Sequence, residues 1–299
     1  MKKLKIGYFA DGPWSHEAFN MIIKDNSLEL AFIAPRINTK DNTLKIYSQK
    51  HKIDYLENSR VNSESFFYQV KKYNCDIFVS MSFNQIFKKK IINLPKFKTI
   101  NCHAGSLPFY RGRNILNWVL INDEDFFGIT VHYMDEGIDT GDIILQRKFP
   151  ITDNDSYKTL LGFSYIECAK ILYDSLKKIQ HGDVKTIKQF SIDPIGSYCK
   201  RRVEGDEFIN WNQSSRQVFN FIRAICKPGP SAHSKIDNKI VKINNSKIIK
   251  EQLFNDFKPG EVLSKNNTSY IVGCKNSLIE IKEVSSPIKV GQFFNSKSC

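Results

Sequence analysis

Residues 101–142 read NCHAGSLPFYRGRNILNWVLINDEDFFGITVHYMDEGIDTGD, and this stretch decides the fold class. It opens inside a β-branched run, Thr99–His103, which predicts a short buried strand. Alternate side chains of a strand face the same way, so Asn101 and His103 should share one face. The residues 104–108, AGSLP, cannot continue the strand well. We therefore expect both side chains at the carboxyl end of a strand, which is where open α/β sheets bind ligands.

The segments before this strand alternate between strand and helix patterns. Apolar runs at 4–9, 28–34 and 76–81 predict strands, while apolar residues recur at helical spacing around 18–23 and 64–73. The alternation predicts an α/β, Rossmann-like fold with a mostly parallel sheet and helices on both faces. No Gly-x-Gly-x-x-Gly follows the first strand, so a dinucleotide site has little support.

The second half of the chain changes character. A long amphipathic helix at 160–179 should pack on the sheet. Ser214 to Gln217 resembles a capping box that opens a further helix. Short β-like runs separated by turn residues then suggest a small OB-like barrel, at 239–243, 261–263, 269–274 and 277–284. We therefore predict two domains, residues 1–205 with the Rossmann-like core and residues 206–299 with a helix and a small β-barrel.

Composition describes a globular chain of 299 residues with a net charge of +13. The first apolar run is too short for a signal peptide, and none approaches the roughly 20 residues of a membrane span. We expect a cytoplasmic protein without a membrane partner. The cysteines form no Cys-x-x-Cys pair and the histidines are dispersed, so no metal site is expected. The basic charge fits an anionic partner such as tRNA or a phosphorylated sugar, or simply a lysine-rich solvated surface.

The chemistry lies in the loop at 135–142, DEGIDTGD, which follows a second β-rich run at 129–134. Such a loop can return a carboxylate to His103, and Asp139 is the first choice. An amide and an imidazole suit acyl transfer to an amine, because the amide stabilises a tetrahedral oxyanion and the imidazole moves the proton of the amine. A carboxylate would orient the ring and favour its protonated form. His132 lies inside a strand without a motif partner, which favours a structural role.

Three motifs together carry a resemblance: Asn-x-His at 101–103, Ser-Leu-Pro-x-Tyr-Arg-Gly at 106–112 and Asp-x-Gly-x-Asp-Thr-Gly-Asp at 135–142. The set resembles the formyltransferases that use 10-formyltetrahydrofolate. That family includes methionyl-tRNA formyltransferase and the sugar nucleotide N-formyltransferases. The run 110–120 is most similar to the sugar branch, since the tRNA enzymes usually carry Arg-Gly-Ala-Ala-Pro there.

The resemblance implies roles for individual residues. Asn101 would stabilise the oxyanion, His103 would be the acid/base, and Asp139 would tune the histidine. The co-substrate 10-formyltetrahydrofolate would be held by Gln85, Ile86, Phe87, Asp135, Glu136, Gly137, Ile138 and Asp139. The acceptor would contact Tyr110, Arg111, Arg113 and Asn114, where the Arg113 guanidinium suits phosphates. No metal is implied.

The function expected from this resemblance is transfer of a formyl group to the amino group of a nucleotide-linked amino sugar, such as a dTDP-linked amino-dideoxyhexose. The product would serve surface polysaccharide synthesis, such as lipopolysaccharide O-antigen, and the enzyme could be a homodimer. Nucleic acid is not expected as a partner. The main alternative is methionyl-tRNA formyltransferase, supported by the basic carboxy-terminal part. A non-enzymatic nucleic-acid-binding protein and a folate hydrolase that uses water as acceptor are further alternatives.

Overall fold

The computed structural model describes residues 3–57, 60–250 and 256–295. The chain forms two compact units that interleave along the sequence. Unit 1 comprises Met1–Gly112, Phe127–Phe149 and Gly162–Cys199, and unit 2 comprises Arg113–Phe126, Pro150–Leu161 and Lys200–Cys299. The domain boundary expected between residues 205 and 206 stays a prediction.

Unit 1 is built on a mixed sheet with the strand order β3-β2-β1-β4-β5-β7-β8. The strands from β1 to β5 are parallel, and β7 runs antiparallel to β5. The expected Rossmann-like, mostly parallel sheet is therefore confirmed. The strand bounds are β1 Leu4–Ala10, β2 Leu28–Ala34, β3 Asp54–Tyr55, β4 Ile77–Met81, β5 Thr99–His103, β7 Phe126–Tyr133 and β8 Ile143–Pro150.

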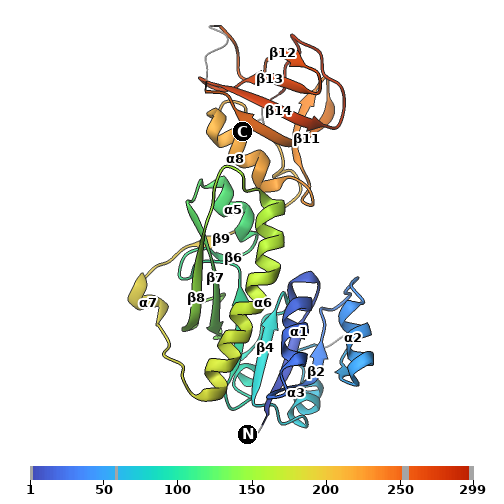
Figure 1. The fold of residues 1–299 in the computed structure, drawn as a ribbon, viewed down its shortest axis with the longest axis vertical. Helices are drawn as coiled ribbons and strands as arrows, with labels where there is room; N and C mark the ends of the chain where they lie inside the picture. Colours follow the sequence, from blue (N-terminus) through green and yellow to red (C-terminus); the bar gives the residue numbers. More distant parts are fainter. Residues whose placement is uncertain (1–2, 58–59, 251–255, 296–299) are drawn as a thin grey trace. The chain divides into compact units, whose positions relative to one another are not determined.

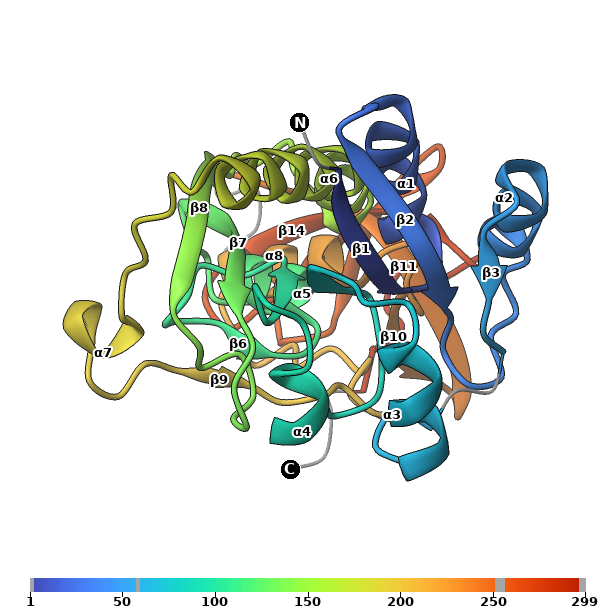
Figure 2. The same ribbon diagram turned by 90° about the horizontal axis from the view of Figure 1, so that it is seen from below.

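Helices cover both faces of this sheet, as the sequence predicts. Figure 2 shows α1 and α6 on one side of the strands and α3 and α4 on the other. None of the helices in the described residues combines the length and the apolar character that a membrane span requires. The helix bounds are α1 Pro13–Lys24, α2 Thr43–His51, α3 Glu64–Lys71, α4 Lys89–Ile92, α6 Tyr157–His181 and α7 Gln189–Ile192.

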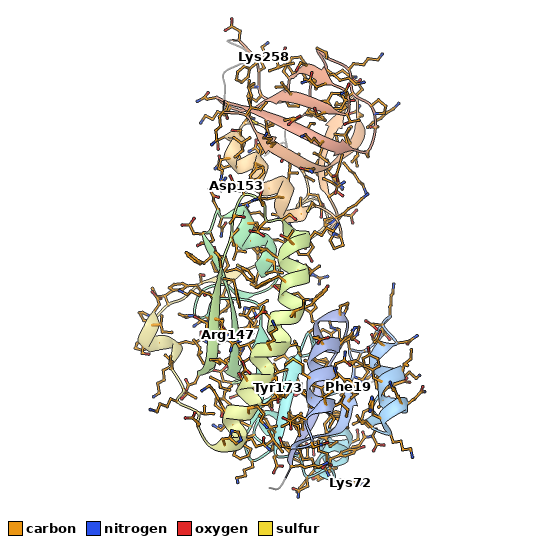
Figure 3. The ribbon with its side chains drawn as sticks, viewed as in Figure 1. Phe19, Lys72, Arg147, Asp153, Tyr173 and Lys258 are labelled. Atoms are coloured by element: carbon orange, nitrogen blue, oxygen red, sulfur yellow. The ribbon has the colours of Figure 1, made fainter. Side chains whose placement is uncertain are left out.

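The long helix α6 buries the stripe predicted from its periodicity. Cys168, Leu172 and Leu176 are all fully or nearly fully buried. Beside this stripe, the Tyr173 hydroxyl donates a 2.8 Å hydrogen bond to Asp25, the residue that follows α1. Figure 3 shows Tyr173 among the side chains of α6. Apolar burial and this polar contact together fix α6 to unit 1.

A cluster of aromatic rings fills the core of unit 1 between the sheet and α3. The Phe9 ring stands edge-on to five partners at centroid distances of 5.0–6.0 Å, which are Phe32, Phe66, Phe78, Phe83 and Phe87. Edge-to-face pairs at this spacing each add about 1 kcal/mol beyond the area they bury. The cluster makes a rigid support for the ends of β1 and β4.

Unit 2 pairs helices with an antiparallel sheet of strand order β10-β11-β14-β13-β12. Helix α8 has the capping box expected at Ser214 and Gln217, and it packs against β11 and β14 (Figure 1). β10 was not predicted, because its alternating polar residues follow directly on a Pro-Gly-Pro turn. The bounds are α5 Ile115–Ile121, α8 Ser215–Ile225, β10 Ala232–Ile236, β11 Lys239–Ile248, β12 Val262–Asn266, β13 Ser269–Gly273 and β14 Leu278–Val284.

The segment Phe293–Asn295 joins the two outer strands of this sheet. Phe293 bridges to Glu261, just before β12, and Asn295 bridges to Lys235 in β10. Because β10 and β12 are the first and last strands in the order, this segment bonds to both edges. The result is a small, nearly closed antiparallel unit, which confirms the expected smaller β domain.

Candidate active site

Strand β5 places Asn101 and His103 side by side on one face, as the alternation predicts. β5 lies between parallel β4 and antiparallel β7, with Ser80 opposite Asn101 on one side and His132 on the other. His103 is opposite Thr130. The His103 side chain is only 9% exposed, whereas Asn101 is partly exposed. The strand therefore presents an accessible amide next to a shielded imidazole.

Asp139 completes the set from the loop between β7 and β8. Its Oδ2 lies 3.6 Å from Nδ1 of His103. Its Oδ1 lies 3.6 Å from Nε2 of His132 and 3.5 Å from the amide nitrogen of Asn101. One carboxylate thus contacts the amide and both imidazoles, and the structure brings together the three residues that the sequence singled out.

The environment of Asp139 keeps its carboxylate ionised. Burial alone raises the pKa of Asp139, but the charges of His103 and His132, the hydrogen bond to His132 and a 3.0 Å hydrogen bond from the Gly112 N–H lower it. The net effect holds the pKa of Asp139 well below its ordinary value. Asp139 also adopts a left-handed backbone with φ 55°, which is uncommon for a residue with a side chain. These contacts keep the carboxylate in a defined position.

The loop after β5 closes over the His103 ring. The ring Nε2 lies 2.7 Å from the carbonyl oxygen of Tyr110. A carbonyl only accepts hydrogen bonds, so this nitrogen carries the hydrogen and Nδ1 faces Asp139. A Cβ on Gly105 would lie 2.6 Å from the Tyr110 oxygen and 2.7 Å from Cδ2 of His103. Only glycine therefore fits at this position while the ring stays in place.

His132 belongs to the same cluster, although the sequence favoured a purely structural role. Its Nδ1–H donates to the Tyr133 carbonyl at 2.8 Å, and its Nε2 lies 3.3 Å from the amide nitrogen of Asn101. The side chain is 2% exposed. The structural interpretation is incomplete, because the same ring faces Asp139. The missing signal was the antiparallel register of β5 and β7, which places His132 directly opposite Asn101.

Comparisons with known proteins identify the family. A "Formyl transferase" family model matches residues 31–162, and a "Formyl transferase, C-terminal domain" model matches residues 203–298. Methionyl-tRNA formyltransferase of Geobacter metallireducens is 30% identical over 241 residues, covering 81% of this chain and 75% of that protein. The chain belongs to the formyl transferase family. The resemblance inferred from the three motifs is thereby confirmed at the level of the family.

The chain is also similar to a bifunctional protein and to solved N-formyltransferases. Bifunctional polymyxin resistance protein ArnA of Wigglesworthia glossinidia brevipalpis is 35% identical over 240 residues, which cover 80% of this chain and 36% of that protein. The solved structure of WlaRD, a sugar 3N-formyl transferase, matches 96% of this chain and 99% of its own, with 24% identity and a TM-score of 0.71. The solved N-formyltransferase from Helicobacter canadensis matches 95% of this chain and 100% of its own, with 24% identity and a TM-score of 0.71. The solved structures share the fold of this formyl transferase.

The loop expected to hold the folate of a formyl transferase is exposed and internally braced. The Asp135 carboxylate accepts hydrogen bonds from the Gly137 N–H at 3.0 Å and from the Thr140 hydroxyl at 2.6 Å. Glu136 is exposed, and Ile138 is 55% exposed. The turn thus presents an apolar side chain, Ile138, and exposed backbone groups next to Asp139.

The other predicted folate residues occupy different environments. Ile86 is 69% exposed, whereas the Phe87 ring is buried in the aromatic core. The Gln85 side-chain oxygen accepts a 3.2 Å hydrogen bond from the Val61 N–H. Only the backbone of Phe87 is left for contact with a ligand, because its side chain is part of the core. The assignment of these residues to folate stays a prediction.

A pocket of about 300 Å³ lies between α4, the start of β5 and this loop. Its lining includes Lys89, Lys98, Met134, Asp135 and Glu136. It therefore reaches two of the residues predicted for folate. Both lysines and carboxylates line it, so its wall offers hydrogen-bond donors as well as acceptors. Within the described part of the chain, no group of His, Cys, Asp and Glu forms a candidate metal site.

The predicted acceptor residues divide into buried and exposed ones. Arg111 is 7% exposed, and its guanidinium donates to Gln189 and to the carbonyl of Ile195. These contacts favour a bracing role for Arg111 over contact with an acceptor. Arg113 and Asn114 are exposed, and Asn114 stands at the start of α5 with φ 58°.

Tyr110 is partly exposed and has a left-handed backbone, with φ 57°. Its N–H donates a 3.1 Å hydrogen bond to the Ser197 hydroxyl, and its carbonyl faces His103. The backbone of Tyr110 is therefore committed inside unit 1. Contact of its side chain with an acceptor stays a prediction.

Proposed function

We propose that this formyl transferase moves a formyl group from 10-formyltetrahydrofolate to the amino group of a nucleotide-linked amino sugar. The observation that carries the proposal is the carboxylate of Asp139, which contacts Asn101, His103 and His132 together. Support for the acceptor class comes from the run at 110–114 and from the solved sugar N-formyltransferases, which match this chain over nearly their whole length. One of those proteins was solved with dTDP and 5-N-formyl-THF, the other with folinic acid and dTDP-3-aminofucose.

The transfer is an addition followed by an elimination. The lone pair of the neutral amine attacks the formyl carbon, a C–N bond forms, and the carbonyl electrons move to oxygen. The Asn101 amide donates a hydrogen bond to that oxygen, a contact typically worth 10²–10³-fold in rate. The bond from the formyl carbon to N10 of the folate then breaks. The products are a formamide on the sugar and tetrahydrofolate.

His103 moves the proton that this reaction must relocate. The attacking amine becomes positively charged and gives a proton to the imidazole, and N10 receives one as it leaves. The resting ring carries its hydrogen on Nε2, so it first passes to the tautomer in which Nδ1–H faces the Asp139 carboxylate; Nε2 then leaves the Tyr110 carbonyl and its free lone pair accepts the proton of the amine. An ionised carboxylate at 3.6 Å stabilises the imidazolium that forms in between. General acid–base catalysis of this kind contributes about 10²–10⁴-fold.

The substrates are assigned to the two predicted groups of residues. The folate donor is assigned to residues 85–87 and 135–139, beside the pocket at α4. The acceptor phosphates are assigned to Arg113, whose exposed guanidinium can bind phosphate oxygens in a bidentate manner. Homodimer formation, a cytoplasmic location and a role in surface polysaccharide synthesis stay predictions.

The test is a donor-dependent mass shift measured across a panel of amino-sugar nucleotides. We expect one sugar to gain the mass of a single carbonyl unit when 10-formyltetrahydrofolate is present, and to stay unmodified with the Asn101→Ala or His103→Ala variant. A panel that stays unmodified while the donor remains intact would contradict the acceptor assignment. Release of free formate without an acceptor would instead indicate a folate hydrolase.

Methionyl-tRNA formyltransferase is the second candidate. It is favoured by sequence relatives such as the enzyme of Geobacter metallireducens and by the net charge of +13. Charged initiator tRNA belongs in the same assay as the rival acceptor. Formylation of this tRNA with binding that weakens steeply as salt rises would favour this candidate. Absence of tRNA binding at low salt would remove it.

A further inference from the structure

Three consecutive residues, Tyr110 to Gly112, connect a short strand to the catalytic cluster. β6, Arg111–Gly112, pairs with β9, Tyr198–Cys199. The carbonyl of Tyr110, just before β6, accepts from His103, and the N–H of Gly112 donates to the Asp139 carboxylate. The segment 110–112 therefore sets the distance between the imidazole and the carboxylate. The side chain of Arg111 helps to hold this segment in place, together with the pairing of β6 and β9.

Arg111 is held by the amide of Gln189, the first residue of α7. Gln189 is 3% exposed, and its Oε1 accepts from Nε of Arg111 at 3.0 Å and from Nη2 at 2.8 Å. Its Nε2 donates to the carbonyls of Asp139 and Gly141, both at 2.8 Å. A side-chain amide has two donor hydrogens and two acceptor lone pairs, so Gln189 uses its full capacity here. The planar guanidinium fixes the orientation of that amide.

The loop at residues 139–141, which Gln189 contacts, depends on its neighbours to keep its conformation. Asp139 has a left-handed backbone, a conformation that is unfavourable for a residue with a side chain and that the surroundings must impose. Gly141 lies against β7 so closely that a Cβ there would collide with the backbone of Tyr133. Gln189 holds the carbonyl of Asp139 on one side, and Gly112 holds its carboxylate on the other.

We propose that Gln189 and Arg111 are positioning residues for formyl transfer, which act on the reaction through Asp139. They form a buried relay in which Arg111 anchors the segment that contacts His103, and Gln189 anchors the loop that carries the carboxylate. The inference deepens the proposed function, since it uses formyl transfer as one readout. It predicts that disturbing Gln189 changes turnover without changing which substrates bind.

The decisive variant is Gln189→Glu. Glutamate keeps the shape and an acceptor oxygen for Arg111, but it has no N–H for the carbonyls of Asp139 and Gly141. The matched control is Gln180→Glu on α6. Gln180 also accepts from a cation, Lys177 at 2.9 Å, and donates to the Ser27 carbonyl at 2.8 Å; neither partner belongs to the catalytic cluster.

We expect Gln189→Glu to lower kcat about 10–100-fold while KM for the folate donor changes less than about threefold, because misplacement of a catalytic group by about 1 Å has costs of this size. Gln180→Glu should keep wild-type kcat. In an Asp139→Asn background, Gln189→Glu should have no further effect on kcat, since residues that act through one group are not additive. An undiminished effect in that background, or wild-type kcat for Gln189→Glu, would overturn the proposal.

Two further measurements test the inference if Gln189→Glu does not fold or if no acceptor is found. If Gln189→Glu does not fold, judged by thermal unfolding and circular dichroism, Arg111→Lys takes its place in both backgrounds, because it removes the guanidinium fork and leaves the amide. Hydrogen exchange needs no acceptor: exchange of the Gly112 amide should rise in Gln189→Glu and not in Gln180→Glu. Equal exchange in the two variants would refute the relay, whereas failure of the wild type to formylate any acceptor would refute only the proposed function.

Discussion

Replacement of Gly105 by alanine tests whether the position of His103 controls activity. The substitution adds one methyl group to the loop that closes over the ring. Its Cβ would lie 2.6 Å from the Tyr110 carbonyl oxygen and 2.7 Å from Cδ2 of His103, with Nε2 nearer still. The Gly105 backbone does not have a left-handed φ, so alanine adds no strain of that kind, and the perturbation comes from the contacts with the His103 ring and the Tyr110 carbonyl.

The size of the effect follows from these distances. Non-bonded heavy atoms prefer a separation of about 3.5–4.0 Å, so the ring or the loop must move by roughly 1 Å. A shift of that size in a catalytic group costs about 10²-fold in rate, equivalent to about 2.7 kcal/mol of transition-state stabilisation. Overpacking should also lower stability by about 1–3 kcal/mol. We expect kcat for formyl transfer to fall about a hundredfold in a protein that still folds.

The assay is steady-state formyl transfer combined with urea unfolding, and the control is Gly162→Ala. Gly162 lies on α6, and a Cβ there would meet no atom within 4 Å. Alanine at that helical position should stabilise the fold by up to about 1 kcal/mol and leave kcat unchanged. Wild-type turnover in Gly105→Ala would show that the ring has room to adapt, and the reasoning about its confinement would be wrong.

Three other predictions concern pH and stability. The fold holds the pKa of Asp139 below its unfolded value of about 3.9, so the ionised carboxylate stabilises the protein at neutral pH and this contribution is lost as pH falls through and below that value. Urea unfolding of Asp139→Asn should therefore show a larger deficit against wild type at pH 7 than at pH 3.5, and an equal deficit would contradict it. Tyr173→Phe removes the hydrogen bond to Asp25 and should cost about 1 kcal/mol in the same assay with unchanged kcat. Trp211 is fully buried and stacks on Phe294 at 5.0 Å, so Trp211→Ala should cost about 3–5 kcal/mol, and a loss below about 1 kcal/mol would show that this core can collapse around the gap.

The sequence was sufficient where the signal was local. Apolar runs located the parallel strands, and strand alternation placed Asn101 and His103 on one face. The position of Asp139, in a glycine-containing acidic loop after a strand, indicated that its carboxylate can return to His103. The long stripe of α6 appeared at its predicted positions because its burial depends only on helical periodicity.

The sequence was insufficient where partners lie far apart along the chain. His132 joins the cluster only through the antiparallel register of β7, which no local pattern specifies. Arg111 meets Gln189 across 78 positions, so its burial could not be separated from surface exposure. Phe87 lies in a stretch that suits a ligand pocket equally well, and only the packing of its ring against Phe9 places it in the core.

The bridge that Phe293 and Asn295 make between β12 and β10 also covers the edges of the sheet, which would otherwise be able to pair with another molecule. An edge strand with unpaired N–H and C=O groups can form hydrogen bonds with a strand of another molecule, and a charged or covered edge strand prevents this. A protein shortened to Gln292 would leave both borders of the small sheet open. Such a protein should self-associate at high concentration even where its formyl transfer chemistry is intact, and light scattering would reveal the difference.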